Sequence, residues 1–283
     1  MKTILACITL CVTLLTVPLT SVAEPPPAAQ TPYIMGVFPF VPTATIEEIF
    51  APLAAELSQA LGRPVKLRCA SSFDKFTDEL KSRDFDLAFI QPFDYIGVAR
   101  PGGYLPLAAR NDILRSQIVV KNDSPVETLK DLKGKSMGMP PKVAAVSFLN
   151  RITLKKAGLI PDTDVKMVYL ASHQACLQQL MIGTVAACGV SPGGIRIAEM
   201  QLKTTFRLIQ ESPEIPTPLF VVKKDLPQKD RDTILRVLTT TDLAGVKPEL
   251  RNMFVETMSK PFRKATDEEY DVVRTMMDTD EAR

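Results

Sequence analysis

Residues 33–69, YIMGVFPFVPTATIEEIFAPLAAELSQALGRPVKLRC, decide the fold class. They open with a short apolar run, Tyr33–Phe38, and close with a short stretch in which apolar and basic residues alternate, Val65–Cys69. Between these runs, the apolar side chains of residues 46–61 recur at helical spacing, and the stripe ends at Gly62. A strand, an amphipathic helix and a second strand in this order form a β-α-β unit, which is typical of parallel sheets covered by helices.

The same alternation of apolar runs and amphipathic stretches continues along the chain. Further strands are predicted at residues 87–90, 105–109, 116–120, 136–139, 165–170, 185–190, 206–209 and 219–222. Helices are predicted at residues 73–81, 144–156, 173–182, 194–200, 229–238, 247–258 and 267–277. We therefore predict an α/β fold in which mostly parallel sheets are flanked by helices.

Two of these strands, residues 116–120 and 219–222, interrupt the regular series. Each is followed by a polar turn and a new helix. We interpret them as the two crossovers of a two-lobed protein, with hinges at 116–120 and 217–222 about which the lobes close. Lobe one is then formed by residues 31–115 with 221–283, and lobe two by residues 116–220.

Residues 1–23 have the features of a secretory signal peptide. Lys2 precedes an apolar run, Ile4–Val17, and small residues end the segment. The run is followed by Pro18, and no later stretch has the ~20 apolar residues that a membrane span needs. We predict that a cleaved signal exports the chain to the periplasm, without stable membrane insertion. Residues 24–30, with three consecutive prolines, form a stiff leader.

Charge and motifs argue against several classes of function. Removing Lys2 from the 34 basic residues leaves 33, against 32 acidic residues, so no basic face for nucleic acid is indicated. The chain has one histidine and lacks a nucleophile elbow, a phosphate-binding loop and a paired-histidine zinc motif. We predict a monomeric binding protein that is not an enzyme and uses no cofactor.

Several motifs resemble those of one known family. They are GVFP at 36–39, LGRPV at 61–65, DLAF at 86–89 followed by QPFDY at 91–95, LKDLKGK at 129–135, SHQA at 172–175 and SPEIP at 212–216. In this order they resemble the binding proteins of phosphate, phosphite and phosphonate ABC importers, a branch of the type II periplasmic binding fold. The resemblance implies that a small oxyanion is held between two lobes and delivered to an ABC permease.

Candidate ligand-binding residues lie at the carboxyl ends of the predicted strands, where open sheets bind ligands and helix amino ends offer N–H donors. The candidates are Pro39, Phe40, Cys69, Ser71, Ser72, Gln91, Tyr95, Val143, Ala144, Ala145, His173, Cys176 and Cys188.

Three of these candidates have an alternative structural role. His173 is expected to be neutral and to donate one hydrogen bond, as the family's ligand-contacting histidine does; the alternative is a surface or capping residue. Tyr95 matches a family tyrosine that reaches the anion; the alternative is an aromatic residue of the core. Ser71 or Ser72 is alternatively the N-cap of the helix that begins near Phe73.

After the strand at 136–139 the sequence departs from the family. Members that bind phosphonates have an Asp-Pro step and small hydroxyl residues there, whereas this chain has PPKVAAVS at 140–147. Val143, Ala144 and Ala145 leave only backbone N–H groups and the charge of Lys142 to hold an anion. Each missing hydrogen bond to a charged oxygen costs about 1.5–3 kcal/mol, so the expected affinity for a phosphate or phosphonate falls.

Three cysteines of the mature chain, Cys69, Cys176 and Cys188, map near the same strand ends. A helix amino end and the neighbouring His173 favour the thiolate of Cys176. Three thiols suit a soft ligand such as arsenite or copper(I), as in periplasmic arsenite-binding sensors that partner the extracytoplasmic domain of a histidine kinase, which the family resembles. Two alternatives stay open: a Cys176–Cys188 disulfide with Cys69 buried, or three unrelated buried thiols.

Overall fold

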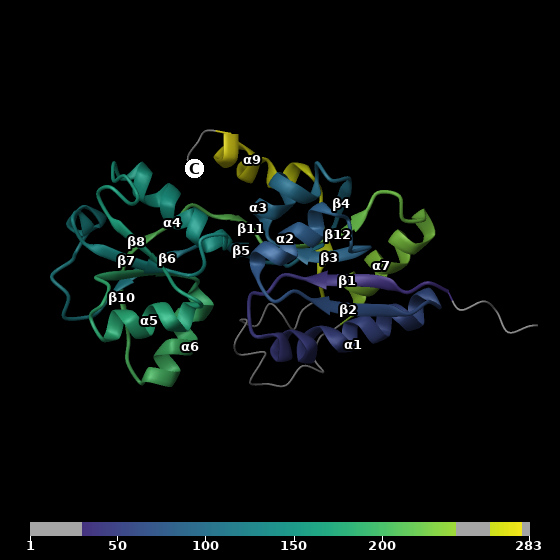
Figure 1. Ribbon diagram of the computed structural model, residues 1–283, viewed down its shortest axis with the longest axis horizontal. Coiled ribbons are helices and arrows are strands. Elements are labelled where there is room, and N and C mark those ends of the chain that lie inside the picture. Colours follow the sequence, from purple (N-terminus) through teal and green to yellow (C-terminus); the bar gives the residue numbers. More distant parts are fainter. Residues whose placement is uncertain (1–29, 242–260, 279–283) are drawn as a thin grey trace, which may run out of the picture. The chain divides into compact units, whose positions relative to one another are not determined.

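The computed structural model describes residues 30–241 and 261–278. These residues form two main sheets, each flanked by helices, and a two-stranded sheet (Figure 1). The six-stranded sheet has the order β13 (Arg263–Lys264), β4 (Tyr104–Ala109), β12 (Leu219–Lys223), β3 (Leu87–Ile90), β1 (Tyr33–Val37), β2 (Val65–Cys69). The five-stranded sheet has the order β10 (Arg207–Glu211), β6 (Gln117–Val120), β9 (Ala187–Val190), β7 (Ser136–Met139), β8 (Lys166–Tyr169). The small sheet pairs β5 (Ile113–Leu114) with β11 (Ile215–Pro216).

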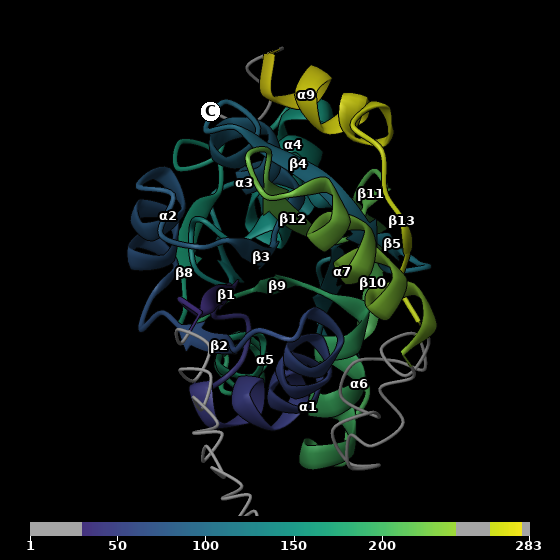
Figure 2. The same cartoon turned by 90° about the vertical axis from the view of Figure 1, so that its right-hand side faces the viewer.

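The helices of the six-stranded sheet cover a single large core. They are α1 (Thr43–Leu61), α2 (Phe73–Lys81), α3 (Pro92–Asp94) with the π-helical turn η1 (Tyr95–Ala99), α7 (Gln228–Thr240), and α9 (Asp271–Asp278) preceded by the 3₁₀ turn η5 (Glu268–Tyr270). The apolar stripe of α1, which includes Ile46, Phe50 and Leu57, is buried. Gly62 ends this helix in the left-handed conformation, at a φ of 60° that favours glycine. Helix α7 packs on α1 and β4 (Figure 2).

Helices cover both faces of the five-stranded sheet, because its strands alternate their side chains between two cores. Ile118 and Val120 of β6 join one core with α4 (Ala145–Lys156), near the 3₁₀ turn η2 (Leu129–Leu132). Val119 faces the other core, with α5 (His173–Met181) and α6 (Pro192–Leu202). In Figure 1, α4 accordingly lies on one side of this sheet and α5 with α6 on the other.

Both main sheets are parallel at one end and antiparallel where the chain crosses between them. Strand β1 is parallel to β2 and β3, and β7 is parallel to β8 and β9. In contrast, β12 is antiparallel to β3 and β4, and β6 is antiparallel to β9 and β10. The chain leaves the first sheet through β5 into β6 and returns from β10 through β11 into β12.

The predicted α/β architecture is confirmed, and the bounds of β2, β3, β7 and α2 agree with those predicted. The expected roles of residues 116–120 and 219–222 as crossovers are wrong, because β6 lies inside the five-stranded sheet between β10 and β9, and β12 lies inside the six-stranded sheet between β3 and β4. The returning crossover lies at about residues 212–218, which share only 217–218 with the expected hinge. The lobe boundaries stay a prediction. The predicted signal peptide and the helix at 247–258 lie outside the described residues. Among the helices of residues 30–241 and 261–278, none is long and apolar enough to cross a membrane.

Candidate functional site

A cavity of about 400 Å³ opens where the carboxyl ends of strands from both sheets meet. Its aromatic wall comes from the six-stranded sheet and the helices that follow its strands: Phe38, Phe40, Phe73 and Phe89. The five-stranded sheet contributes the first residues of three helices, including Ala144, Ala145, His173, Ser191 and Gly193. Residues of the crossover region complete the lining: Arg110, Asp112, Ile113, Leu114, Arg115, Thr217 and Pro218. The volume lies in the range of ~300–1,000 Å³ that is usual for small-molecule sites.

The amino ends of α5 and α6 give this cavity N–H donors and a positive potential. Ser172 caps α5 by accepting a hydrogen bond from the Ala175 N–H at 3.1 Å, and Ser191 caps α6 by accepting from the Gly194 N–H at 3.2 Å. The first amides of a helix have no acceptor within it, and the helix dipole places partial positive charge there. The earlier N–H groups therefore suit an anion: those of His173 and Gln174 on α5, and that of Gly193 on α6, whose first residue, Pro192, has no N–H.

His173 is the first residue of α5 and lines the cavity. Its Nδ1 accepts a hydrogen bond from the backbone N–H of Ser191 at 3.3 Å, so the neutral ring carries its proton on Nε2. Burial lowers the pKa of His173 to about 4. Gly194 makes the close approach of the ring feasible, because a Cβ there would lie 2.8 Å from the Cβ of His173. His173 therefore lies at the cavity, and burial favours its neutral form, whereas its donation of a hydrogen bond to a ligand stays a prediction.

Gln91 connects the end of β3 to the amino end of α4. Its Oε1 accepts a hydrogen bond from the Ala145 N–H at 2.8 Å, and its Nε2 donates to the carbonyl of Val143 at 3.3 Å and to Asp94 at 3.0 Å. The ring of Phe93 stacks on Phe148 of α4, with centroids 4.7 Å apart. Burial raises the pKa of Asp94 to about 6, against the lowering effects of the Gln91 hydrogen bond and the Lys81 charge. The first amide of α4 is therefore occupied by a side chain of this protein.

Six of the predicted ligand-binding residues line the cavity: Pro39, Phe40, Gln91, Ala144, Ala145 and His173. Val143 lies beside it and contributes a carbonyl to Gln91. The other candidates, which are Cys69, Ser71, Ser72, Tyr95, Cys176 and Cys188, are not part of its lining.

The expected position of Tyr95 at the ligand is wrong, and so is that of the two serines. Tyr95 is buried in the core of the six-stranded sheet, against Tyr270, and its hydroxyl donates to Asp267 at 2.6 Å. Ser72 is the N-cap of α2 and accepts from the Lys75 N–H at 3.2 Å, while Ser71 is exposed. In the structure, Tyr95 is therefore an aromatic residue of the core, and Ser72 is the N-cap of α2, as the alternative roles predicted.

The cysteines do not form a trio of thiols. Cys176 and Cys188 are joined by a disulfide that ties α5 to β9, and both are fully buried. Gly138 makes room for this bridge, because a Cβ there would lie 2.9 Å from the Cys176 sulfur. Cys69 is a free thiol at the end of β2, where burial and the nearby Glu47 raise its pKa. Among the described residues, no cluster of three His, Cys, Asp or Glu side chains suits a metal ion. The prediction that Cys176 is a thiolate is therefore wrong. The structure has the disulfide between Cys176 and Cys188, which was one of the alternatives open from the sequence.

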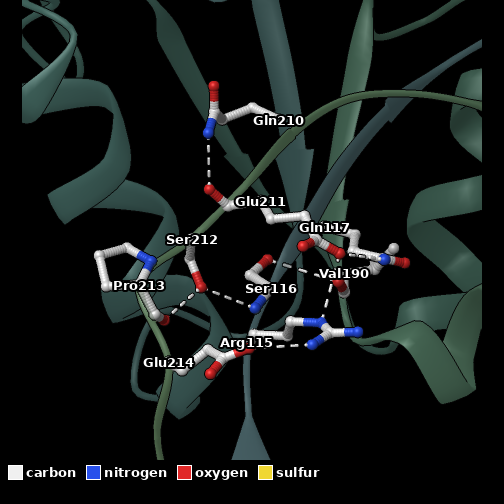
Figure 3. A network of polar contacts seen from close by, with 9 residues as sticks. All are labelled: Arg115, Ser116, Gln117, Val190, Gln210, Glu211, Ser212, Pro213 and Glu214. Carbon is white, nitrogen blue, oxygen red and sulfur yellow. Dashed lines mark hydrogen bonds and ion pairs between the residues drawn. The ribbon is translucent and has the colours of Figure 1, made fainter.

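A polar network holds the two crossover segments together beside the cavity (Figure 3). The Ser116 N–H donates to the Ser212 hydroxyl at 2.8 Å, and the Ser212 N–H donates to the Ser116 carbonyl at 2.9 Å. Arg115 pairs with Glu214 at 3.0 Å and with Glu211 at 3.3 Å. The two segments thus act as one unit where the chain passes between the sheets.

Sequence reasoning missed the charged lining of the cavity, which consists of Arg110, Asp112, Arg115 and Arg196. Arg110 forms an ion pair with Asp112, and burial lowers the pKa of Arg110. Arg196 is exposed on α6. The search for residues just after the predicted strands did not include them, because they lie in the crossover region or one turn into a helix.

Two helix-covered sheets, two crossovers and a cavity at the strand carboxyl ends define a class, the type II periplasmic binding proteins. A family model described as "ABC transporter, phosphonate, periplasmic substrate-binding protein" matches residues 35–270. The chain therefore belongs to this family of periplasmic substrate-binding proteins.

Solved structures with the same fold share little sequence with this chain. PhnD1 of Prochlorococcus marinus in complex with methylphosphonate is 18% identical, with a TM-score of 0.73 over 88% of this chain and 98% of the other. A binding protein component of a phosphonate ABC transporter from Pseudomonas aeruginosa is 16% identical, with a TM-score of 0.71 over 88% and 86%. A Xanthomonas citri protein bound to ATP is 14% identical, with a TM-score of 0.70 over 88% and 99%. At these identities the likeness establishes the fold.

Proposed function

We propose that this protein binds a small phosphonate-class oxyanion in the cavity and delivers it to the permease of an ABC importer. The observation that carries the proposal is the meeting of the α5 and α6 amino ends with His173 at one cavity. Family membership supports the transport role, and the predicted export to the periplasm would place the protein beside such a permease.

The acid group is proposed to sit at α5 and α6. The first amide of α4 already has an acceptor in Gln91, whereas the leading amides of α5 have none within their helix. The Nε2–H of neutral His173 then adds a directed donor. A hydrogen bond to a charged oxygen contributes about 1.5–3 kcal/mol, so one such bond corresponds to a roughly 10- to 150-fold change in affinity.

We propose that the two sheets close about the crossover segments when a ligand binds, and that this closure signals to the permease that the site is occupied. Arg115, Ser116 and Ser212 link the two crossover segments, so rotation between the sheets would pass through this pair of segments. Small-angle scattering of the mature protein, with and without saturating methylphosphonate, tests the closure. Identical profiles for the two samples would refute it.

Calorimetric titration of the mature protein with methylphosphonate, phenylphosphonate and phosphate tests the function itself. We expect binding of at least one phosphonate, and a tenfold or greater loss of affinity in His173→Ala. Ser71→Ala is the control, since Ser71 is exposed and not part of the cavity lining. An affinity unchanged by His173→Ala would place the ligand elsewhere, and a lack of phosphonate binding at millimolar concentration would refute the function.

A further inference from the structure

The charges around the cavity restrict the kind of anion that fits. Its charged lining residues are three arginines, Arg110, Arg115 and Arg196, and one carboxylate, Asp112. Arg110 is paired with Asp112, and Arg115 is paired with Glu211 and Glu214. Within residues 30–241 and 261–278, the Arg196 side chain has neither a hydrogen bond nor an ion pair. Arg196 is thus the cation of this lining that is available to a ligand, five positions into the helix whose amino end faces the cavity.

The same inventory leaves no unpaired carboxylate in the described lining for a positive charge on the ligand. Asp112 is the carboxylate of the described lining, and it is held by Arg110. An ammonium group would therefore lose its water without gaining an anion, in a cavity with more arginines than carboxylates. The lining favours a ligand that is anionic throughout.

The wall opposite these groups is aromatic and joined into one cluster. Phe38 lies 4.9 Å from Phe40, 6.1 Å from Phe73 and 5.6 Å from Phe89, measured between ring centroids. Phe38 and Phe89 are buried, whereas Phe40 and Phe73 are half-buried and keep accessible surface at the cavity. Rings placed in this way favour a flat apolar group, which packs edge-to-face or offset against them.

The size of the cavity agrees with a substituent larger than methyl. With the ~30 Å³ of a liquid water molecule as an upper value for each heavy atom, the five heavy atoms of methylphosphonate fill less than half of the roughly 400 Å³, whereas the ten of phenylphosphonate fill about three quarters at most. A small ligand would leave the aromatic wall in contact with water, and the apolar surface would contribute nothing to affinity.

We propose that the ligand is a phosphonate-class anion with an aryl or similarly bulky apolar substituent and no cationic group. Its acid group meets Arg196, His173 and the amino ends of α5 and α6, and its substituent packs on Phe40 and Phe73, which the buried Phe38 supports. Arg196 and the phenylalanine cluster are then the residues that determine specificity. This inference rests on the proposed function, because it assigns the substrate class of the same site.

Calorimetric titration of the mature protein with phenylphosphonate, methylphosphonate and 2-aminoethylphosphonate tests the assignment. We expect phenylphosphonate to bind at least about tenfold more tightly than methylphosphonate, and 2-aminoethylphosphonate to bind more weakly than either. Tighter binding of methylphosphonate or of the aminated probe would overturn the assigned class and leave the proposed function standing. Failure of all three probes to bind would remove both.

Two variants test the named residues. Arg196→Gln is expected to weaken phenylphosphonate binding by about tenfold or more, while Arg236→Gln, which makes the same charge change on exposed α7 away from the cavity, leaves it unchanged. Phe40→Leu is expected to reduce the preference for phenylphosphonate over methylphosphonate and to keep the affinity for methylphosphonate. Equal effects of Arg196→Gln and Arg236→Gln, or an unaltered preference in Phe40→Leu, would refute the roles assigned here. Circular dichroism melting curves identify any variant that has lost its fold, and Phe73→Leu then replaces Phe40→Leu in the comparison.

Discussion

Replacing Asp94 by Asn is expected to make the stability of this protein fall as the pH is lowered from 6.5 to 4. The reason is a pair of buried titratable groups with opposite effects. Burial lowers the pKa of His173 from 6.5 to about 4 and raises the pKa of Asp94 from 3.8 to about 6. In this pH range, the unfolded chain carries the proton on His173, whereas the folded chain carries it on Asp94. The two effects oppose each other in the unmodified protein.

The signs and magnitudes follow from proton linkage. A folded His173 that resists protonation contributes stability that is full above pH 6.5 and is lost as the pH falls toward 4. The shift of about 2.5 units corresponds to an upper value of about 3 kcal/mol. A buried Asp94 carboxylate costs a similar upper value of about 3 kcal/mol above pH 6, and the cost is relieved as the group is protonated. Both side chains keep some solvent contact, which reduces each value.

Urea denaturation at a series of pH values between 4 and 6.5 measures these contributions. We expect a nearly constant free energy of unfolding for the unmodified protein, a decrease with falling pH in Asp94→Asn, and an increase in His173→Gln. The double variant is the control and should again show little pH dependence. If Asp94→Asn were as insensitive to pH as the unmodified protein, His173 would not be held neutral by burial, and the hydrogen-bonding scheme of the cavity would be wrong.

Three further predictions concern single contacts. Replacing both Cys176 and Cys188 by Ala should lower the free energy of unfolding by about 3 kcal/mol, as expected for a bridge that spans 12 residues. The control Cys69→Ala should change it little, and urea denaturation of both variants measures the difference. Tyr95→Phe should lower the thermal stability through loss of the Asp267 hydrogen bond, by about 1–3 kcal/mol, and leave ligand affinity unchanged; a weakened affinity would return Tyr95 to the ligand site. Gln91→Ala should lower the stability of the protein by about 1–3 kcal/mol, because the Ala145 amide loses its acceptor. Gln59→Ala, on the exposed side of α1, is the control and should have little effect in the same melting experiment.

The sequence predicted the individual elements of this fold better than their arrangement. The apolar runs of β3 and β7 and the alternating stretch of β2 are bounded by polar residues or turns, so their ends could be located within a residue. Strands β5, β11 and β13 were not predicted because two-residue strands have no periodicity to detect. The position of β12 was missed for another reason: an apolar run indicates a buried strand but not which sheet it joins or in which direction it runs.

The sequence could predict those residues of the candidate site that directly follow a strand, but not contacts between residues distant in the sequence. Residues just after strands, such as Pro39, Gln91 and His173, reach the cavity because the strand ends meet there. Tyr95 also follows a strand, but it opens the turn η1 and points into the core, toward a partner, Asp267, that lies 172 residues away in the sequence. Contacts of such separation leave no local signal. The spacing of cysteines alone does not show which sulfurs meet, so the sequence leaves the disulfide as one of several alternatives.

The loss of hydroxyl residues at 143–145 is compensated within the protein, and this changes how the cavity attracts an anion. Gln91 supplies the acceptor that the Ala145 amide needs, so the first amide of α4 is satisfied without a ligand. An amide oxygen is neutral, however, and it leaves the partial positive charge of the α4 dipole in place. Helix α4 therefore still contributes to the positive potential of the cavity while giving up a direct hydrogen bond. In the proposed binding mode, the direct contacts to the acid group come from α5, α6, His173 and Arg196. Substitutions at His173 and Arg196 should therefore weaken binding more than any change at 143–145.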